Sequence, residues 1–197
     1  MATAPCVRAE RLVSRPIISR QMAGAGPELI TFLDLIELFF VAMFYDKGVS
    51  LTYIRKAAET AQREFDTDHP FAVQQFETDG SRIFVMLQAE PDSGSHTQEL
   101  IDAQYVFDDQ VRPFFKTKLD CDLEGVTRFW PLGKGRCVVL DPHRSFGKPL
   151  DVASGVPTRP LYQAHLAGET IGTIARWYEI PPETVECAVE YEQSLLA

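Results

Sequence analysis

The sequence predicts a mainly helical α+β protein, with a helix pair, a middle that contains β-hairpins and a carboxy-terminal bundle of three helices. Residues 29–65 contain two successive apolar segments with helix start and stop signals. Residues 76–87 and 128–140 place short apolar runs on either side of glycine-containing turns, as β-hairpins do. Residues 160–192 contain three short helical segments, separated by one glycine and by a pair of prolines.

The first two helices have local signals at their ends. Thr31 is expected to cap a helix over residues 31–46, with Asp34 completing a capping box. Ser50 is expected to cap the next helix, over residues 51–65. The exposed face of this second helix should carry Tyr53, Arg55, Lys56 and Arg63.

The first helix is apolar nearly all round, so more than one of its sides must be covered. The second helix and a hairpin can cover one side, and a second subunit is expected on another. The residues expected in this homodimer interface are Phe32, Leu35, Ile36, Phe39, Phe40 and Met43.

The middle of the chain predicts two hairpins and one short acidic helix. One hairpin has Thr78-Asp79-Gly80 as its turn, and the other joins residues 128–132 to residues 136–140 through Gly133-Lys134-Gly135. The helix is expected over residues 98–107. A domain boundary between Phe115 and Leu140 divides the chain into three parts: a basic tail (1–28), helices with a hairpin and linker (29–125), and a carboxy-terminal domain (126–197).

Composition limits the kind of protein. The chain has 197 residues, of which 45% are hydrophobic and 24% charged, as in an ordinary globular protein. Its net charge of −9 divides into +1 for residues 1–65, −7 for residues 66–120, +2 for residues 121–160 and −5 for residues 161–197. This acidic balance argues against broad, non-specific binding of nucleic acid, which needs lysine and arginine at phosphates.

The cysteines and the amino-terminal residues predict the compartment. Cys6, Cys121, Cys137 and Cys187 have no CxxC spacing, so we expect reduced thiols and neither a disulfide framework nor a metal site. Residues 1–20 lack the apolar core of a signal peptide. The apolar run at residues 29–45 contains Asp34 and Glu37, which favours a buried helix over a membrane span. A cytoplasmic protein without cofactor or membrane contact follows.

The last two helices fit the pattern of a helix-turn-helix. The positions that this unit buries are small or apolar: Ile174, Ala175, Tyr178, Ile180, Val185 and Ala188. Glu179 replaces the usual turn glycine, and any packed three-helix bundle shares the same periodicity. The outward face of the last helix carries Glu183, Glu186 and Glu190, which phosphate would repel, and Arg176 is the basic residue on offer. These residues favour a protein-binding module over a DNA reader.

Residues 138–192 carry the pattern D-P…GKP…G-x-P-T…GET-I…IA…Y…V…A-x-x-Y-E. This pattern resembles the small domain, long catalogued as a domain of unknown function, of VapB-like antitoxins that occur beside PIN-like ribonuclease toxins. Residues 29–59 resemble the helices that follow the winged motif of MerR-like regulators. The segments His69-Pro70-Phe71-Ala72 and Thr78-Asp79-Gly80-Ser81-Arg82-Ile83-Phe84 are similar to those that join both units in longer antitoxins.

The resemblance implies an antitoxin that binds a PIN-like ribonuclease toxin and, as a dimer, represses its own operon. Acidic residues would mimic phosphate in the basic RNA-binding groove of the toxin. The candidates for this contact are Asp102, Asp108, Asp109, Glu183, Glu186 and Glu190.

Residues 1–28 stand where the family has its first DNA-reading helices. An arginine-rich arm of this kind can enter a minor groove. The candidates for operator DNA are Arg8, Arg11, Arg15, Arg20, Lys47, Arg55, Lys56 and Arg176.

Two other functions are alternatives. A stand-alone MerR-like transcription regulator would bind its operator without a partner. An enzyme would need catalytic groups, but the four histidines stand apart from any nucleophile motif: His69, His96, His143 and His165. The sequence therefore predicts a protein that is not an enzyme.

Overall fold

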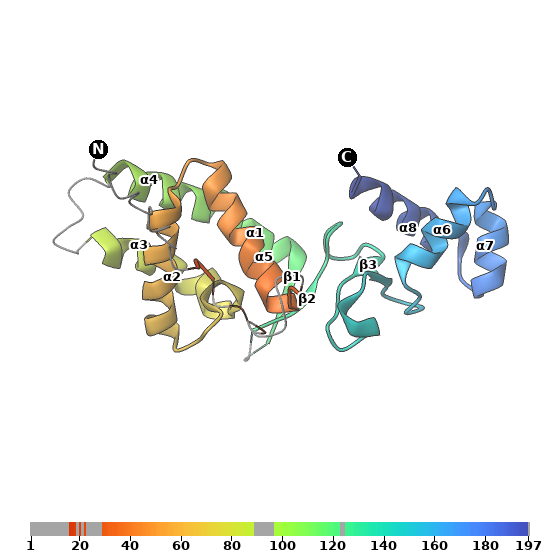
Figure 1. The fold of residues 1–197 in the computed structure, drawn as a ribbon, viewed down its shortest axis with the longest axis horizontal. Coiled ribbons are helices and arrows are strands. Elements are labelled where there is room, and N and C mark those ends of the chain that lie inside the picture. Colours follow the sequence, from red (N-terminus) through yellow and green to blue (C-terminus); the bar gives the residue numbers. More distant parts are fainter. Residues whose placement is uncertain are drawn as a thin grey trace, which may run out of the picture.

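The computed structural model describes residues 16–18, 20, 22, 29–88, 97–122 and 125–196. It confirms a mainly helical α+β fold. Helices α1 to α5 gather at one end of an elongated molecule and α6 to α8 at the other, with β3 between them (Figure 1).

The first two helices form as their caps predict. α1 spans Phe32–Asp46, and the Thr31 side chain and the Asp34 side chain make the reciprocal hydrogen bonds of a capping box. α2 spans Leu51–Phe65, and the Ser50 hydroxyl accepts from the backbone N–H of Tyr53. Tyr53 itself is buried in the core, so its predicted place on the exposed face of α2 is wrong.

The hairpin predicted around Thr78-Asp79-Gly80 is wrong. Its residues form α3 (Gln74–Gln88), after a short 3-10 turn, η1 (Pro70–Ala72). Phe76, Ile83 and Leu87 are buried at helical rather than alternating spacing. Gly80 is a packing glycine, because a Cβ atom there would lie 2.4 Å from Cε2 of Phe107.

The predicted acidic helix is confirmed, and it continues further than expected. α4 (Thr97–Val106) runs into a π-helical turn, η3 (Phe107–Val111), and then into α5 (Arg112–Lys118). Pro113 has no N–H for the regular helical hydrogen bond. The wider turn just before this proline is therefore a local adjustment of one continuous helical segment.

The second predicted hairpin is also wrong in its pairing. β1 (Leu119–Cys121) pairs antiparallel with β2 (Val126–Phe129), and β3 (Val138–Val139) pairs antiparallel with β4 (Leu150–Asp151). A single bridge joins the two predicted arms, in which Phe129 and Leu140 exchange hydrogen bonds of 3.0 and 2.8 Å. The Gly-Lys-Gly segment turns toward α5 instead, where the Lys134 N–H donates to the carbonyl of Thr117.

The three carboxy-terminal helices are confirmed as α6 (Thr158–Leu166), α7 (Ile171–Tyr178) and α8 (Pro182–Ser194). Thr170 caps α7, and Pro182 is the first residue of α8. Glu179 takes the left-handed conformation, with φ 54°, at the position that glycine usually occupies.

One core lies under the first helices and another holds α6 to α8 together. Stacked and tilted phenylalanines dominate the first core, where the Phe40 and Phe115 rings are 4.9 Å apart. The second core contains Leu161, Ile174 and Val185. Ile174, Ala175, Ile180, Val185 and Ala188 are buried as the helix-turn-helix pattern requires, whereas Tyr178 is 37% exposed, so its predicted burial is wrong.

Candidate interaction surfaces

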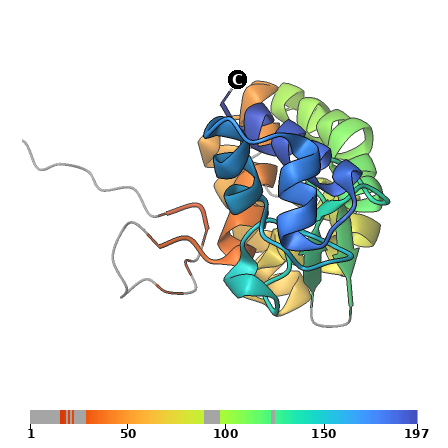
Figure 2. The ribbon, with the colours of Figure 1, turned by 90° about the vertical axis from the view of Figure 1, so that its right-hand side faces the viewer.

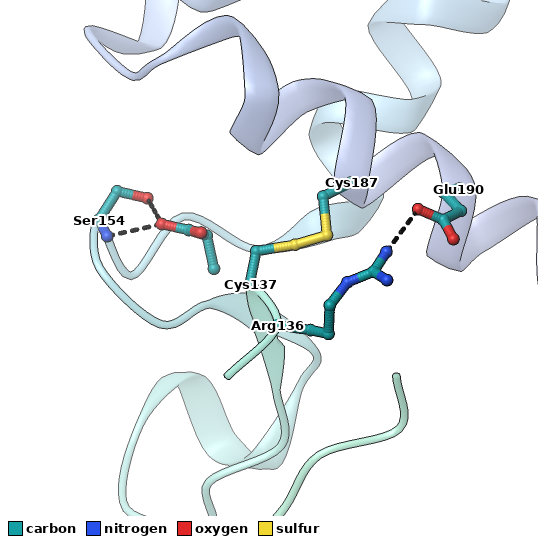
Figure 3. The surroundings of a disulfide bond; sticks show 6 residues. Arg136, Cys137, Ser154, Cys187 and Glu190 are labelled. Carbon is teal, nitrogen blue, oxygen red and sulfur yellow. Dashed lines mark hydrogen bonds and ion pairs between the residues drawn. A yellow bond between two sulfur atoms is a disulfide. The ribbon is translucent and has the colours of Figure 1, made fainter. Parts of the chain in front are cut away.

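The outer face of α8 is acidic. Glu183 and Glu186 are exposed, and within the described part of the chain neither takes part in an ion pair. Glu190 is exposed on the same helix, but its carboxylate lies 2.9 Å from Nη2 of Arg136 (Figure 3). The free negative charge of this face is therefore concentrated on its first turns.

A disulfide bond between Cys137 and Cys187 fastens α8 to the β3 segment (Figure 3). The two Cα atoms are 6.6 Å apart, within the range that disulfides span. The expectation of reduced thiols was wrong for this pair, since the fold brings together cysteines that are 50 residues apart. Burial raises the pKa of the neighbouring Tyr191 to about 12. Cys121 is a free cysteine, and burial raises the pKa of its thiol to about 11.

Glu192 is a buried acidic residue on the inner face of α8. It accepts a hydrogen bond of 2.6 Å from the Thr158 hydroxyl, and its other oxygen lies 3.6 Å from Nη1 of Arg159. These contacts tie α8 to the first turn of α6. Glu192 lies on the same helix as Glu183 and Glu186. Its position in the helical repeat places its carboxylate on the inner face of α8, whereas those of Glu183 and Glu186 lie on the outer face.

His69 is not isolated, although its surroundings in the sequence suggested this. Its Nδ1 atom lies 3.4 Å from the fully buried carboxylate of Glu37, which also accepts from the backbone N–H of Phe71 at 3.3 Å. Burial raises the pKa of Glu37, and the hydrogen bond between the His69 ring and the Glu37 carboxylate raises the pKa of His69. This pair joins α1 to the His-Pro-Phe-Ala segment.

The second acidic region lies on α4 and the turn that follows it. Asp102 is half-buried, Asp109 is exposed, and Asp108 makes an ion pair of 2.9 Å with Arg112. Arg112 also donates to the Ser81 hydroxyl of α3, which places Asp108 beside that helix.

The candidate basic residues that the structure describes are spread over both ends of the molecule. Arg8, Arg11 and Arg15 lie outside the described residues, and the guanidinium of Arg20 donates to the carbonyl of Leu29. Lys47 is exposed directly after α1, and Arg55 and Lys56 are half-buried on α2. Arg176 is exposed on α7, at the opposite end of the molecule from α2 (Figure 1).

The predicted dimer residues face the core of their own chain more than expected. Ile36 and Phe40 are fully buried, so their side chains offer no surface to a second subunit. Phe39 packs against Phe114 and Phe129, with ring centroids 5.9 and 5.1 Å apart. Residues of the same chain therefore cover a side of α1 on which we expected a second subunit. The partly exposed members of the set are Phe32, Leu35, Phe39 and Met43.

Among the described residues, no group of three or more histidine, cysteine, aspartate or glutamate side chains is placed to hold a metal ion. Within the same residues, no helix has the length and apolar character needed to cross a membrane.

These features define a mainly helical α+β protein whose last helix buries one face and presents carboxylates on the other. No family model matches the chain. A likeness to one named sequence supports a VapB-like antitoxin at the level of the family. The chain is 25% identical to the "Putative antitoxin VapB45" of Mycobacterium tuberculosis, in an alignment of 199 positions, gaps included, that covers 96% of the chain and 80% of the relative.

The fold is also similar to a solved structure. The crystal structure of Rv2018 from Mycobacterium tuberculosis superposes with a TM-score of 0.65 at 22% identity, over 81% of this chain and 78% of that one. This likeness shows the fold alone.

Proposed function

We propose that the chain is the antitoxin of a type II toxin–antitoxin pair, and that it binds and neutralises a PIN-like ribonuclease toxin. The observation that carries the proposal is the similarity to an antitoxin along 96% of the chain. The role is one of binding, without catalysis.

The acidic outer face of α8 is the proposed contact with the toxin. An enzyme that binds RNA has a basic surface along its substrate groove. Glu183 and Glu186 present carboxylates to solvent on successive turns of a helix, and their charge is opposite to that of such a groove. Asp109, with Asp102 and Asp108 beside it, is the second proposed contact.

Repression of the antitoxin's own operon is the second part of the proposal. Here α7 and α8 act as a helix-turn-helix that mainly binds protein. The basic arm of residues 1–28, the α2 face with Arg55 and Lys56, and nearby Lys47 contact DNA in a homodimer. The proposed DNA contacts lie in residues 1–125, and α8 with its proposed toxin contact lies in residues 126–197.

A co-expression experiment tests the proposal. The product of the neighbouring small gene is expressed with and without the full chain, and growth and co-purification at low salt are measured. Neutralisation predicts growth arrest by the toxin alone, rescue by the chain, and a complex that survives gel filtration. Growth arrest without rescue, or absence of a complex at low salt, would contradict the proposal.

A further inference from the structure

α8 is held from two sides by two separate groups of residues. One side, with Val185 and Ala188, belongs to the core that α8 shares with α6 and α7. Figure 2 views the molecule from this end, with α6 to α8 in blue. Another side, with Cys187 and Tyr191, packs against Val138 of β3. The three-helix bundle and the β3 segment therefore position α8 together.

Contacts of different strength fasten α8 to the β3 segment. The ion pair between Arg136 and Glu190 joins side chains that are 50 and 60% exposed, and such pairs contribute little in water. The apolar cluster around Val138 is small. The bond between Cys137 and Cys187 is covalent, and it closes a loop of chain 50 residues long. The attachment of α8 to β3 therefore depends mainly on the oxidation state of this cysteine pair.

Cys137 is the cysteine that a reductant reaches first, because it is partly exposed whereas Cys187 is buried. The thiolate of a small thiol attacks Sγ of Cys137 and forms a mixed disulfide, while Cys187 leaves as a thiolate and takes up a proton. A second small thiol attacks the mixed disulfide and releases Cys137 as a thiol. The protein disulfide thus gains two electrons and two protons, and two small thiols become one small disulfide. Oxidation by a small disulfide is the reverse reaction.

The disulfide lies beside the carboxylates of the proposed toxin contact. Cys187 directly follows Glu186, and it lies one helical turn after Glu183. Closure of the bond therefore fixes both carboxylates relative to the rest of the chain before the toxin arrives. A surface that is fixed in advance loses less conformational entropy on binding.

We infer that the Cys137–Cys187 pair is a redox switch of toxin binding, set by small thiols and disulfides. The disulfide form holds α8 in the position that binds the toxin, and the dithiol form has a lower affinity. The inference rests on the proposed function, and it adds regulation of the same surface. Since coupling between two equilibria is reciprocal, bound toxin makes the disulfide harder to reduce by the same factor.

Affinity for the co-expressed toxin, measured by calorimetry with the oxidised and the reduced full chain, tests the switch. Reduction by dithiothreitol should weaken binding by about tenfold. Cys137→Ser/Cys187→Ser should bind like the reduced chain with and without dithiothreitol, which separates the switch from any effect of the reductant on the toxin. Cys121→Ser is the matched control, because Cys121 is free and its variant should keep the wild-type response.

Two further measurements separate a switch from a purely structural bond. Circular dichroism of the reduced chain should keep the helical signal, because the core that α8 shares with α6 and α7 does not contain the disulfide. Titration with mixtures of reduced and oxidised glutathione should show that the toxin lowers the reduction potential of the disulfide by about 30 mV, which corresponds to the tenfold change in affinity.

The outcomes are distinguishable. If the oxidised and the reduced chain bind the toxin equally well, or the reduced chain binds more tightly, the switch is wrong and the proposed function stands. If neither form binds, the proposed function fails, and the switch with it. Loss of the helical signal on reduction, or a response of Cys137→Ser/Cys187→Ser to dithiothreitol like that of the wild type, would also overturn the inference.

Discussion

The Thr158 hydroxyl donates a hydrogen bond of 2.6 Å to the carboxylate of Glu192, and both residues are buried where α6 meets α8. The bond fixes the inner face of the helix whose outer face carries the proposed toxin contacts. The position of the outer face of α8 therefore depends on a buried hydrogen bond that does not contact the toxin.

Loss of this hydrogen bond should destabilise the fold. Thr158→Val keeps the shape of the side chain but leaves the Glu192 carboxylate without its nearest donor, so we expect a loss of about 1–3 kcal/mol in the free energy of unfolding. Urea unfolding followed by circular dichroism measures this loss. Thr52→Val, at an exposed position of α2, is the control. A loss no larger than that of the control would show that the bond contributes little.

The Glu37–His69 pair should make stability depend on pH. Both pKa values are raised above their ordinary values of 4.5 and 6.5, so the folded state binds protons more tightly than the unfolded chain does. The contribution is complete at low pH and is lost as pH rises through the folded-state values. We expect Glu37→Gln to flatten the fall in unfolding free energy between about pH 5 and pH 8.

The control for the Glu37 variant is His143→Gln, because His143 is exposed and lies far along the chain from Glu37. This variant should keep the wild-type slope of stability against pH. If the slope of unfolding free energy against pH is equal in the wild type and in Glu37→Gln, the buried pair does not cause the pH dependence.

Gly80 should not tolerate a side chain, although it lies inside α3. An added Cβ atom would meet the Phe107 ring at 2.4 Å, so Gly80→Ala should destabilise by about 1–3 kcal/mol despite the better helix propensity of alanine. In α7, Gly172 has open space around it, and Gly172→Ala should stabilise by about 0.5–1 kcal/mol. Thermal melts of the two variants should move in opposite directions. A shift of both in the same direction would contradict the packing of α3 on η3.

The Cys137–Cys187 disulfide should stabilise the attachment of α8. Reduction, or a Cys137→Ser/Cys187→Ser variant, should lower the free energy of unfolding by about 2–4 kcal/mol, because the bond closes a long loop. Urea unfolding with and without dithiothreitol measures this difference. Cys121→Ser is the control, since Cys121 is free and its replacement should leave the effect of dithiothreitol unchanged. Equal stability of the wild type in both buffers would show that the bond does not form.

Most helices were predictable because their signals are local. Thr31 and Asp34, Ser50, Thr170 and Pro182 act on their own first turns, so the neighbouring residues are enough to place the ends of these helices. α3 was missed because Thr-Asp-Gly is also a turn signal. Only the distant Phe107 ring shows why a glycine stands there.

The interaction surfaces were predictable in part for the same reason. The helical period alone placed Glu183 and Glu186 on the outside of α8. The contacts of Glu190 with Arg136, of Cys187 with Cys137 and of His69 with Glu37 join residues far apart in the sequence, and only tertiary packing brings them together.

Charge reversal on α8 should weaken toxin binding. Glu183→Lys/Glu186→Lys places like charges against the basic groove of the toxin, so we expect an affinity at least about tenfold lower, with the difference shrinking as salt rises. The matched control is Asp46→Lys/Glu59→Lys, which makes the same charge change at exposed positions of α1 and α2. An equal loss in both variants would point to net charge alone.

Inhibition of RNA cleavage is the direct measure of whether this chain neutralises the toxin. The purified toxin of the neighbouring gene is mixed with a labelled RNA, and the full chain is added in increasing amounts. We predict that cleavage falls to background near stoichiometric antitoxin, and that Glu183→Lys/Glu186→Lys needs a large excess to do the same. Undiminished cleavage at a large excess of wild-type chain would contradict the claim that this protein is an antitoxin.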